Sequence, residues 1–331
     1  MLTNPIGQHF PTFLKEQVFT NKMWSDRYNS FSAASQLRAM CAGWTLRGRR
    51  RCGKSPAYAN PKIAGSKQND TQTFQVNKIN SNNYTPRLFE AFKDDIYTFI
   101  DDIRSVKLDN LPEPFLPIHG ANYGEIYPKI IFCGWETRNY HNLSAWVDDA
   151  NKNLDHVIFW QEEFLNHEFV HWRSNFGADF WSFNLKFLAK AHNINDWRDF
   201  YRTPDKYIDI LSSFVWANTD SIERFSVTAK KFGGDYTSWE KVKKASLRFD
   251  NFRRLLNTFE PDIVLIEHWD VAEEWIHQDV KYSKEEIIDE FLWHYVVEGT
   301  SCNVFWLPHP RGHNSKGVDS MKLINQIWNI L

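Results

Sequence analysis

The sequence is poor in features that mark several common classes of protein. Its four cysteines, Cys41, Cys52, Cys133 and Cys302, form no C-x-x-C pair, which argues against a zinc cluster and against a disulfide framework. No stretch approaches the roughly 20 apolar residues that span a bilayer. The N-terminal residues also lack the basic and apolar regions of a secretion signal. We therefore expect a cytoplasmic protein that makes no membrane contact.

An excess of charge is missing as well. The 39 Lys and Arg residues nearly balance the 41 Asp and Glu residues, and the formal net charge is -2. A nucleic-acid partner would therefore have to meet a local basic patch. Neither a G-x-x-x-x-G-K-[ST] loop nor a G-x-G-x-x-G turn follows any expected strand, which excludes the usual phosphate-binding and dinucleotide-binding folds.

The N-terminal quarter of the chain differs from the remainder. Polar and small residues dominate "RGRRRCGKSPAYANPKIAGSKQNDTQT", which has neither a helical nor an alternating apolar period. We predict an irregular basic extension over residues 1–84 and a folded domain over residues 85–331. Arg49, Arg50 and Arg51 are candidates for phosphate contact, although a solvated basic loop has the same composition.

Apolar spacing predicts the elements of the folded domain. The segment 86–106 places apolar residues three and four apart, which is typical of an amphipathic helix, with Thr85 as a candidate cap and Pro86 in the first turn. The segment 320–328 suggests a closing helix with Met321, Ile324 and Ile327 on one side. Short apolar runs separated by helix-sized segments predict a parallel sheet covered on both faces. These runs are 129–133, 213–217, 262–266 and 303–307.

Polar side chains follow each of these runs. In open α/β sheets ligands bind at the carboxyl ends of the strands, so these residues are expected to meet at one edge. They are Glu136 and Tyr140 after the first run, Asn218 and Asp220 after the second, Glu267 and His268 after the third, and His309, Arg311, His313, Ser315 and Lys316 after the fourth.

Three of these motifs together resemble the uracil-DNA glycosylase superfamily. The segment Gly134-Trp135-Glu136-Thr137 stands where the G-[QE]-[DAN]-P motif of the first strand would lie. Asn218 matches the base-reading asparagine, and His309-Pro310 matches the histidine motif after the last strand. The resemblance covers roughly residues 125–320. It implies a three-layer α/β/α sandwich with a central four-stranded parallel sheet.

The sequence also departs from that pattern. Thr137 replaces a proline, Arg311 and Gly312 replace small residues, and Trp135 is bulkier than the usual residue. The chain is similar to long bacterial members of the superfamily, some of which resemble phage-defence glycosylases. The target base is therefore open between a uracil-type base and a hypermodified pyrimidine such as glucosylated hydroxymethylcytosine, in DNA repair or antiphage defence.

The resemblance implies a role for each candidate. Glu136 would stabilise the oxocarbenium-like sugar and activate water, while His309 would donate to the leaving base. Asn218, Trp135 and Tyr140 would bind the flipped base. DNA contacts would come from Arg311, His313, Ser315 and Lys316. We expect a monofunctional hydrolase because no lysine is well placed for a Schiff base, and we infer no cofactor, no metal and no obligate protein partner.

Simpler readings and two other functions stay open. Glu136 suits a first helical turn, Asn218 and His309 suit turns, and Trp135 and Tyr140 suit packing. The segment "HEFVH", 167–171, matches H-E-x-x-H, so a zinc metallopeptidase is an alternative if a third ligand comes from His192, Asp179 or Asp196. The basic extension and the many aromatic residues would also suit a nucleic-acid-binding module without catalysis.

Overall fold

The computed structural model describes residues 84–135, 142–154, 157–158, 179–223, 236–268 and 275–331. All of them belong to one compact unit, Lys67–Leu331. The expected basic extension, including Arg49, Arg50 and Arg51, lies outside the described residues apart from Tyr84, which already begins a helix. The boundary expected at residue 85 therefore stays a prediction.

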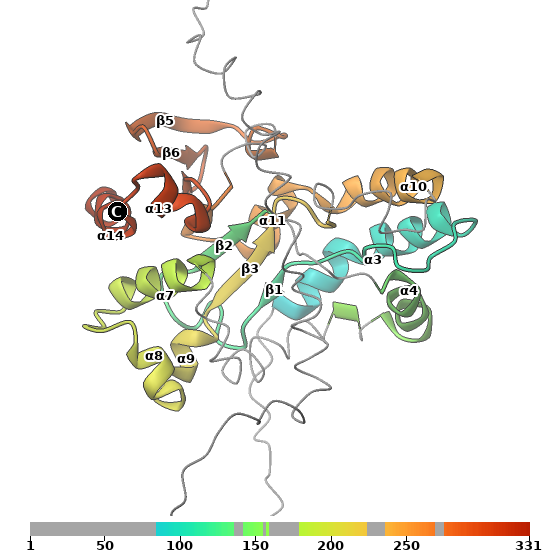
Figure 1. The fold of residues 1–331 in the computed structure, drawn as a ribbon, viewed down its shortest axis with the longest axis horizontal. Helices are drawn as coiled ribbons and strands as arrows, with labels where there is room; N and C mark the ends of the chain where they lie inside the picture. The colour runs from blue at the N-terminus through green and yellow to red at the C-terminus, as the bar shows by residue number, and fades with distance from the viewer. Residues whose placement is uncertain (1–83, 136–141, 155–156, 159–178, 224–235, 269–274) are drawn as a thin grey trace, which may run out of the picture. The chain divides into compact units, whose positions relative to one another are not determined.

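The described residues form a mixed α/β fold around one seven-stranded sheet (Figure 1). Its strand order is β1-β3-β2-β4-β7-β6-β5. The four middle strands pair in parallel, and each begins and ends within one residue of the run expected from sequence. They are β2 (Ile130–Gly134), β3 (Phe214–Asn218), β4 (Ile263–Ile266) and β7 (Asn303–Trp306). Their β-branched and aromatic residues suit strands that are buried on both faces.

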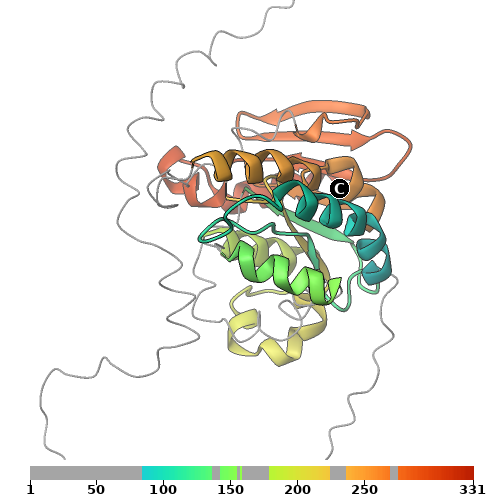
Figure 2. The same cartoon turned by 90° about the vertical axis from the view of Figure 1, so that its right-hand side faces the viewer.

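The four parallel strands expected from sequence are part of a larger sheet, because three antiparallel strands extend it. β1 (Ile118–His119) pairs with β3, and the hairpin of β5 (Tyr282–Asp289) and β6 (Leu292–Val297) adds to β7. Figure 2 shows this hairpin above the helices. β5 escaped detection because it is an edge strand rich in exposed charged residues, so it has no buried apolar run. β1, with two residues, is too short to give a pattern.

Helices cover both faces of the sheet and make it the middle of three layers (Figure 1). On one face, Ile131, Val215 and Val304 pack with one group of helices, and on the other Phe132, Phe214 and Phe305 pack with a second group. The first group is α3 (Tyr84–Ile103), α4 (Leu143–Lys152), α10 (Tyr236–Ser246) and α11 (Phe252–Phe259). The second is α7 (Asp179–Ala191), α8 (Asp199–Arg202), α9 (Ile208–Leu211) and α14 (Ser320–Ile330). Among these helices, none is both long and apolar enough to cross a membrane.

Two details of the predicted helices need correction. Thr85 lies inside α3 instead of capping it, and its buried hydroxyl pairs with His119 Nε2 at 3.1 Å. In α14, Ile324 and Ile327 are buried as expected, but Met321 is 42% exposed. Leu323 takes the third buried position, and Asp319 caps the helix by accepting the N–H groups of Met321 and Lys322.

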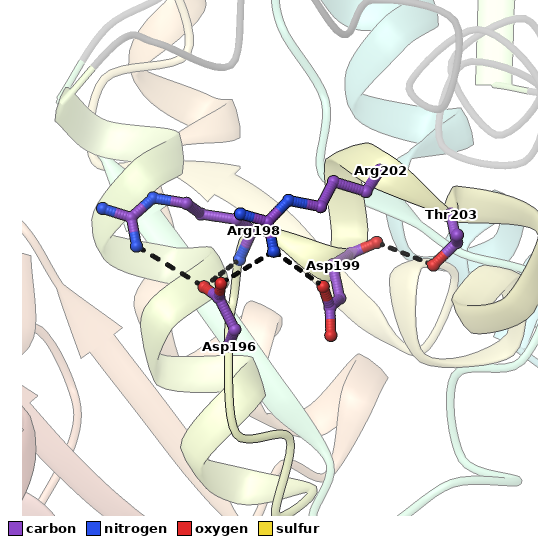
Figure 3. Close-up of polar contacts among 5 residues, drawn as sticks. All are labelled: Asp196, Arg198, Asp199, Arg202 and Thr203. Atoms are coloured by element: carbon purple, nitrogen blue, oxygen red, sulfur yellow. Dashed lines mark hydrogen bonds and ion pairs between the residues drawn. The ribbon is translucent and has the colours of Figure 1, made fainter.

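Surface ion pairs hold the turn between α7 and α8 (Figure 3). The Asp196 carboxylate accepts the backbone N–H of Arg198 at 3.0 Å and a guanidinium N–H of Arg202 at 2.9 Å. Arg202 also donates to Asp199 at 3.2 Å. The hydrogen bond from the Arg198 backbone is the main reason why the pKa of Asp196 is lowered. Exposed pairs of this kind add little stability, so the network orients the turn more than it holds the fold.

The central and edge strands should respond differently to the same substitution. Ile131→Ala empties a fully buried position in β2 and should lower the free energy of unfolding by about 2–5 kcal/mol. Ile287→Ala in β5, where the side chain is 63% exposed, should cost less than about 1 kcal/mol. Urea denaturation measures both variants. Equal losses would contradict the placement of the core.

Candidate functional site

The ends of three neighbouring parallel strands present residues to the same face of the sheet. Gly134 pairs with Asn218, and the N–H of Glu267 donates to Cys133 O at 2.8 Å, one position beyond the last β2–β4 pair. Side chains alternate along a strand. Phe214, Phe132 and Leu265 face α7. Asn218, Gly134 and Glu267 lie an even number of positions further along the same strands, so they lie on the same face. The edge of the sheet therefore carries a row of three positions: the amide of Asn218, the glycine Gly134, which has no side chain, and the carboxyl of Glu267. We call the position of the missing side chain at Gly134 the gap.

The gap in this row is needed for close packing. A Cβ at Gly134 would stand 2.9 Å from Asn218 Oδ1 and 3.5 Å from Cε2 of Phe180. The first distance is shorter than real Cβ contacts allow. Gly134 thus lets the amide of Asn218 and the ring of Phe180 approach the end of β2. The sequence motif predicted the glycine and the asparagine, and the structure brings them together.

Phe180 is a residue of this edge that the sequence did not single out. It lies in the first turn of α7, and its ring is stacked on His309, with ring centroids 6.0 Å apart and an interplanar angle of 24°. Trp181 and Trp216 contact it from the sides. The helical spacing of Phe180 and Asn184, four residues apart, is the only signal that would have placed both on one face of α7.

His309 has a defined tautomer when neutral. It precedes the short 3-10 helix η7 (Pro310–Gly312), and its Nδ1 accepts the backbone N–H of Arg311 at 3.2 Å. A neutral imidazole has one acceptor nitrogen and one donor nitrogen. The proton of neutral His309 is therefore on Nε2, so that this atom is a hydrogen-bond donor.

The indole of Trp135 makes contacts on one ring face and at its Nε1 edge. Two backbone hydrogen bonds continue the β2–β3 pairing beyond the strands, from Thr219 to Gly134 O at 3.0 Å and from Asp220 to Trp135 O at 2.9 Å. The indole Nε1 then donates to Asp220 Oδ2 at 3.0 Å. The ring of His268 stacks on the indole at 4.4 Å and 15°. His268 therefore occupies one of the two indole faces expected to receive a base.

His268 is a buried, neutral imidazole. Its pKa is lowered to about 3, mainly by burial and to a smaller extent by the nearby His309 and Lys316. Neither ring nitrogen has a hydrogen-bond partner among the residues that the structure describes. A buried polar group without a partner is costly, so such groups mark functional sites more often than average positions.

Glu267 and Asn184 form a second buried polar group on the α7 face. Both side chains are buried, with 0% and 1% of their surface exposed, and within the described part of the chain neither has a partner in hydrogen-bond geometry. Burial raises the pKa of Glu267 well above its usual range, and the Asn184 amide lowers it by less. Burial therefore favours the protonated form of the carboxyl. The sequence placed Glu267 at this edge but gave no sign of its burial.

The residues expected to contact DNA after β7 separate into two kinds. They lie in η7 and in α13 (His313–Lys316) instead of an irregular loop. His313 is buried, and its ring nitrogens pair with Ser320 Oγ at 2.8 Å and with Pro308 O at 2.9 Å. Its imidazole is thus engaged within the protein, which does not support the expectation that it contacts DNA. Arg311, Ser315 and Lys316 are exposed.

Other predicted residues lie outside the described ranges. These are Glu136, Tyr140, the basic triplet Arg49, Arg50 and Arg51, and the histidines of the H-E-x-x-H motif, His167 and His171. Within the described ranges, no three histidine, cysteine or acidic residues are grouped so that they could hold a metal ion.

Glu113 is another titratable group of this region that the sequence did not reveal. It belongs to the loop before β1, in which Phe115 N–H donates to Ser221 O at 2.6 Å, just after the end of β3. Its pKa is raised to about 7, mainly by burial; the backbone N–H of Asn142 opposes this rise and the charge of Asp149 adds to it. This carboxyl changes charge near neutral pH.

Comparison of the chain with models of protein families, with curated proteins and with solved structures finds no match.

Glu113 should make the stability of the protein depend on pH. Below pH 4.5 the Glu113 carboxyl is protonated in both the folded and the unfolded state. Between pH 4.5 and about 7 it ionises only in the unfolded state. The folded state therefore loses stability relative to the unfolded state as the pH rises. Relative to Glu113→Gln, the free energy of unfolding should fall by up to about 3 kcal/mol from pH 4.5 to pH 7.5. Urea titrations at several pH values measure this, with exposed Glu125→Gln as control. Parallel pH profiles for the wild type and Glu113→Gln would contradict the prediction.

Proposed function

We propose that the protein is a monofunctional DNA glycosylase, which hydrolyses the N-glycosidic bond of a flipped, non-standard pyrimidine and leaves an abasic site. The observation that carries the proposal lies at the carboxyl edge of four parallel strands, where Asn218 and Phe180 pack against Gly134 and His309 stacks on Phe180. This edge is where open α/β sheets bind ligands. The strand order β3-β2-β4-β7 of the parallel core, with helices on both faces, suits the fold implied by the sequence motifs.

The binding of the base rests on one ring and one amide. An enzyme that acts on a base in DNA takes it out of the stack and holds it by stacking and by hydrogen bonds to its polar edge. Phe180 offers an aromatic ring beside the gap at Gly134, and the Asn218 amide offers both a donor and an acceptor. Trp135, whose ring is stacked on His268, acts as a wall of the pocket.

The departure of the base depends on His309. As the glycosidic bond breaks, negative charge builds on the base and positive charge on the sugar, and a preorganised donor stabilises the developing anion. The Nε2–H of neutral His309 serves as that donor, because Nδ1 is occupied by the Arg311 N–H. The oxygen of the base next to the glycosidic nitrogen is its target.

Water activation and DNA contacts come from residues assigned by sequence. Glu136 follows Trp135 directly, and its carboxylate stabilises the sugar cation and accepts a proton from the attacking water. Arg311, Ser315 and Lys316, all exposed on η7 and α13, contact phosphates, together with Arg49, Arg50 and Arg51 of the basic extension. The target is a uracil-type base or a hypermodified pyrimidine, in repair or in antiphage defence.

Removal of the Glu136 carboxylate or the His309 imidazole should abolish catalysis without loss of DNA binding. Oligonucleotides that carry uracil, hydroxymethylated or glucosylated pyrimidines are incubated with the protein, and alkali-labile sites are measured. Glu136→Gln and His309→Phe should each lower the single-turnover rate by about 100-fold or more. DNA affinity, measured by fluorescence anisotropy, should change little.

The result that would contradict the proposal is a wild-type protein that binds these oligonucleotides and releases no base from any of them. That outcome would favour a binding module. Protease activity accompanied by bound zinc would favour the metallopeptidase instead.

The gap at Gly134 gives a matched pair of substitutions. Gly134→Ala places a methyl group 2.9 Å from Asn218 Oδ1, so it should displace the amide and lower the rate of base release by about tenfold or more. Gly312→Ala, on the same edge, meets only Lys316 at 3.8 Å and should leave the rate unchanged. Single-turnover rates and melting temperatures of both variants provide the test. A fully active Gly134→Ala enzyme would exclude this position from the base pocket.

A further inference from the structure

Glu267 is the buried group that the proposed mechanism does not use. It follows β4, and its backbone N–H donates to Cys133 O at 2.8 Å, which sets it beside Gly134 on the α7 face. Asn218 stands on the other side of Gly134. The carboxyl is thus one strand away from the gap and two strands away from the amide assigned to the base.

Two observations indicate that the Glu267 carboxyl binds a ligand. Both carboxyl oxygens and both polar atoms of Asn184 are buried; the Asn184 amide is near enough to lower the pKa of Glu267, but no described residue, Asn184 included, meets the carboxyl oxygens in hydrogen-bond geometry. Four buried polar atoms without partners are costly in a folded protein. Asn184 also lies one helical turn after Phe180, so the ring beside Gly134 and the amide near Glu267 come from the same face of α7.

The protonation state of Glu267 limits the class of ligand that it can bind. Burial favours the protonated carboxyl, which offers one O–H donor and one carbonyl acceptor side by side. The edge of a 4-aminopyrimidine presents the complement, a ring nitrogen that accepts and an amino group that donates. A 4-aminopyrimidine is also a poorer leaving group than uracil, because its anion is less stable, and protonation of the ring nitrogen compensates for this.

We infer that Glu267 is a further catalytic residue of the proposed reaction, in which it protonates the ring nitrogen N3 of a flipped 4-aminopyrimidine and thereby selects cytosine-type bases over uracil-type bases. The inference rests on the proposed function.

The reaction balances in atoms and charge. The O–H bond of Glu267 breaks and an N3–H bond forms, while the bond between the sugar C1′ and the base N1 breaks and its electron pair goes to the base. Water adds to C1′ and gives its proton to Glu136. The base leaves as a neutral molecule, and the Glu267 carboxylate regains a proton from solvent after release.

A pair of bases that differ only at position 4 tests this inference. Oligonucleotides carry either 5-hydroxymethylcytosine or 5-hydroxymethyluracil at one position, each with and without glucose on the hydroxymethyl group. Single-turnover rates of base release are measured for the wild type, for Glu267→Gln, and for Glu298→Gln, which changes an exposed glutamate in the same way. Thermal melting checks that each variant is folded.

We expect the wild type to release the 4-amino base faster than the 4-oxo base. Glu267→Gln keeps a donor and an acceptor but has no acidic proton, so it should lose about 100-fold or more on the 4-amino base and less than about threefold on the 4-oxo base. Glu298→Gln should match the wild type. A structural role for Glu267 would lower both rates equally.

Three results overturn the inference. They are equal losses on the two bases, no loss on either, and a wild type that releases only 4-oxo bases. In the last case the proposed function stands and only the role of Glu267 fails. A wild type that releases no base at all removes the proposed function and the inference together.

Discussion

Parallel pairing of β3, β2, β4 and β7 is the constraint on which the site depends. Parallel strands end at the same edge of a sheet, so Gly134 and His309, which are more than 170 positions apart in the chain, both lie at that edge, and Phe180 contacts the two of them. Hydrogen bonds beyond the strands extend this order to Trp135, Asp220 and Leu307. The apolar packing on both faces therefore determines where the polar groups stand.

The site contains polar side chains that would form hydrogen bonds with water if they were exposed, but they lie in an environment that excludes water. Glu267, His268 and Asn184 keep polar atoms buried without partners in the described part of the chain. Such an arrangement lowers stability and strengthens every electrostatic interaction with a ligand that enters. Burial raises the pKa of Glu267 and lowers that of His268, so it favours the uncharged form of both side chains.

The sequence predicted the parallel core well, because its strands are short runs of Ile, Val, Phe and Leu that are buried on both faces. The glycine, asparagine and histidine at the edge were also found, since each directly follows a run. The sequence could not reveal β5, whose charged residues face solvent, or the buried position of His313. Phe180 and Glu113 were missed because their importance comes from neighbours distant in the chain.

The most direct test of the account is a crystal structure of the protein with an oligonucleotide that carries a 2′-fluorinated, hydrolysis-resistant pyrimidine nucleotide. The account predicts a flipped base whose ring lies against Phe180 and whose edge is within hydrogen-bond distance of the Asn218 amide and of His309 Nε2. A base that stays in the DNA stack, or that binds away from the edge formed by Gly134, Asn218 and His309, would contradict it.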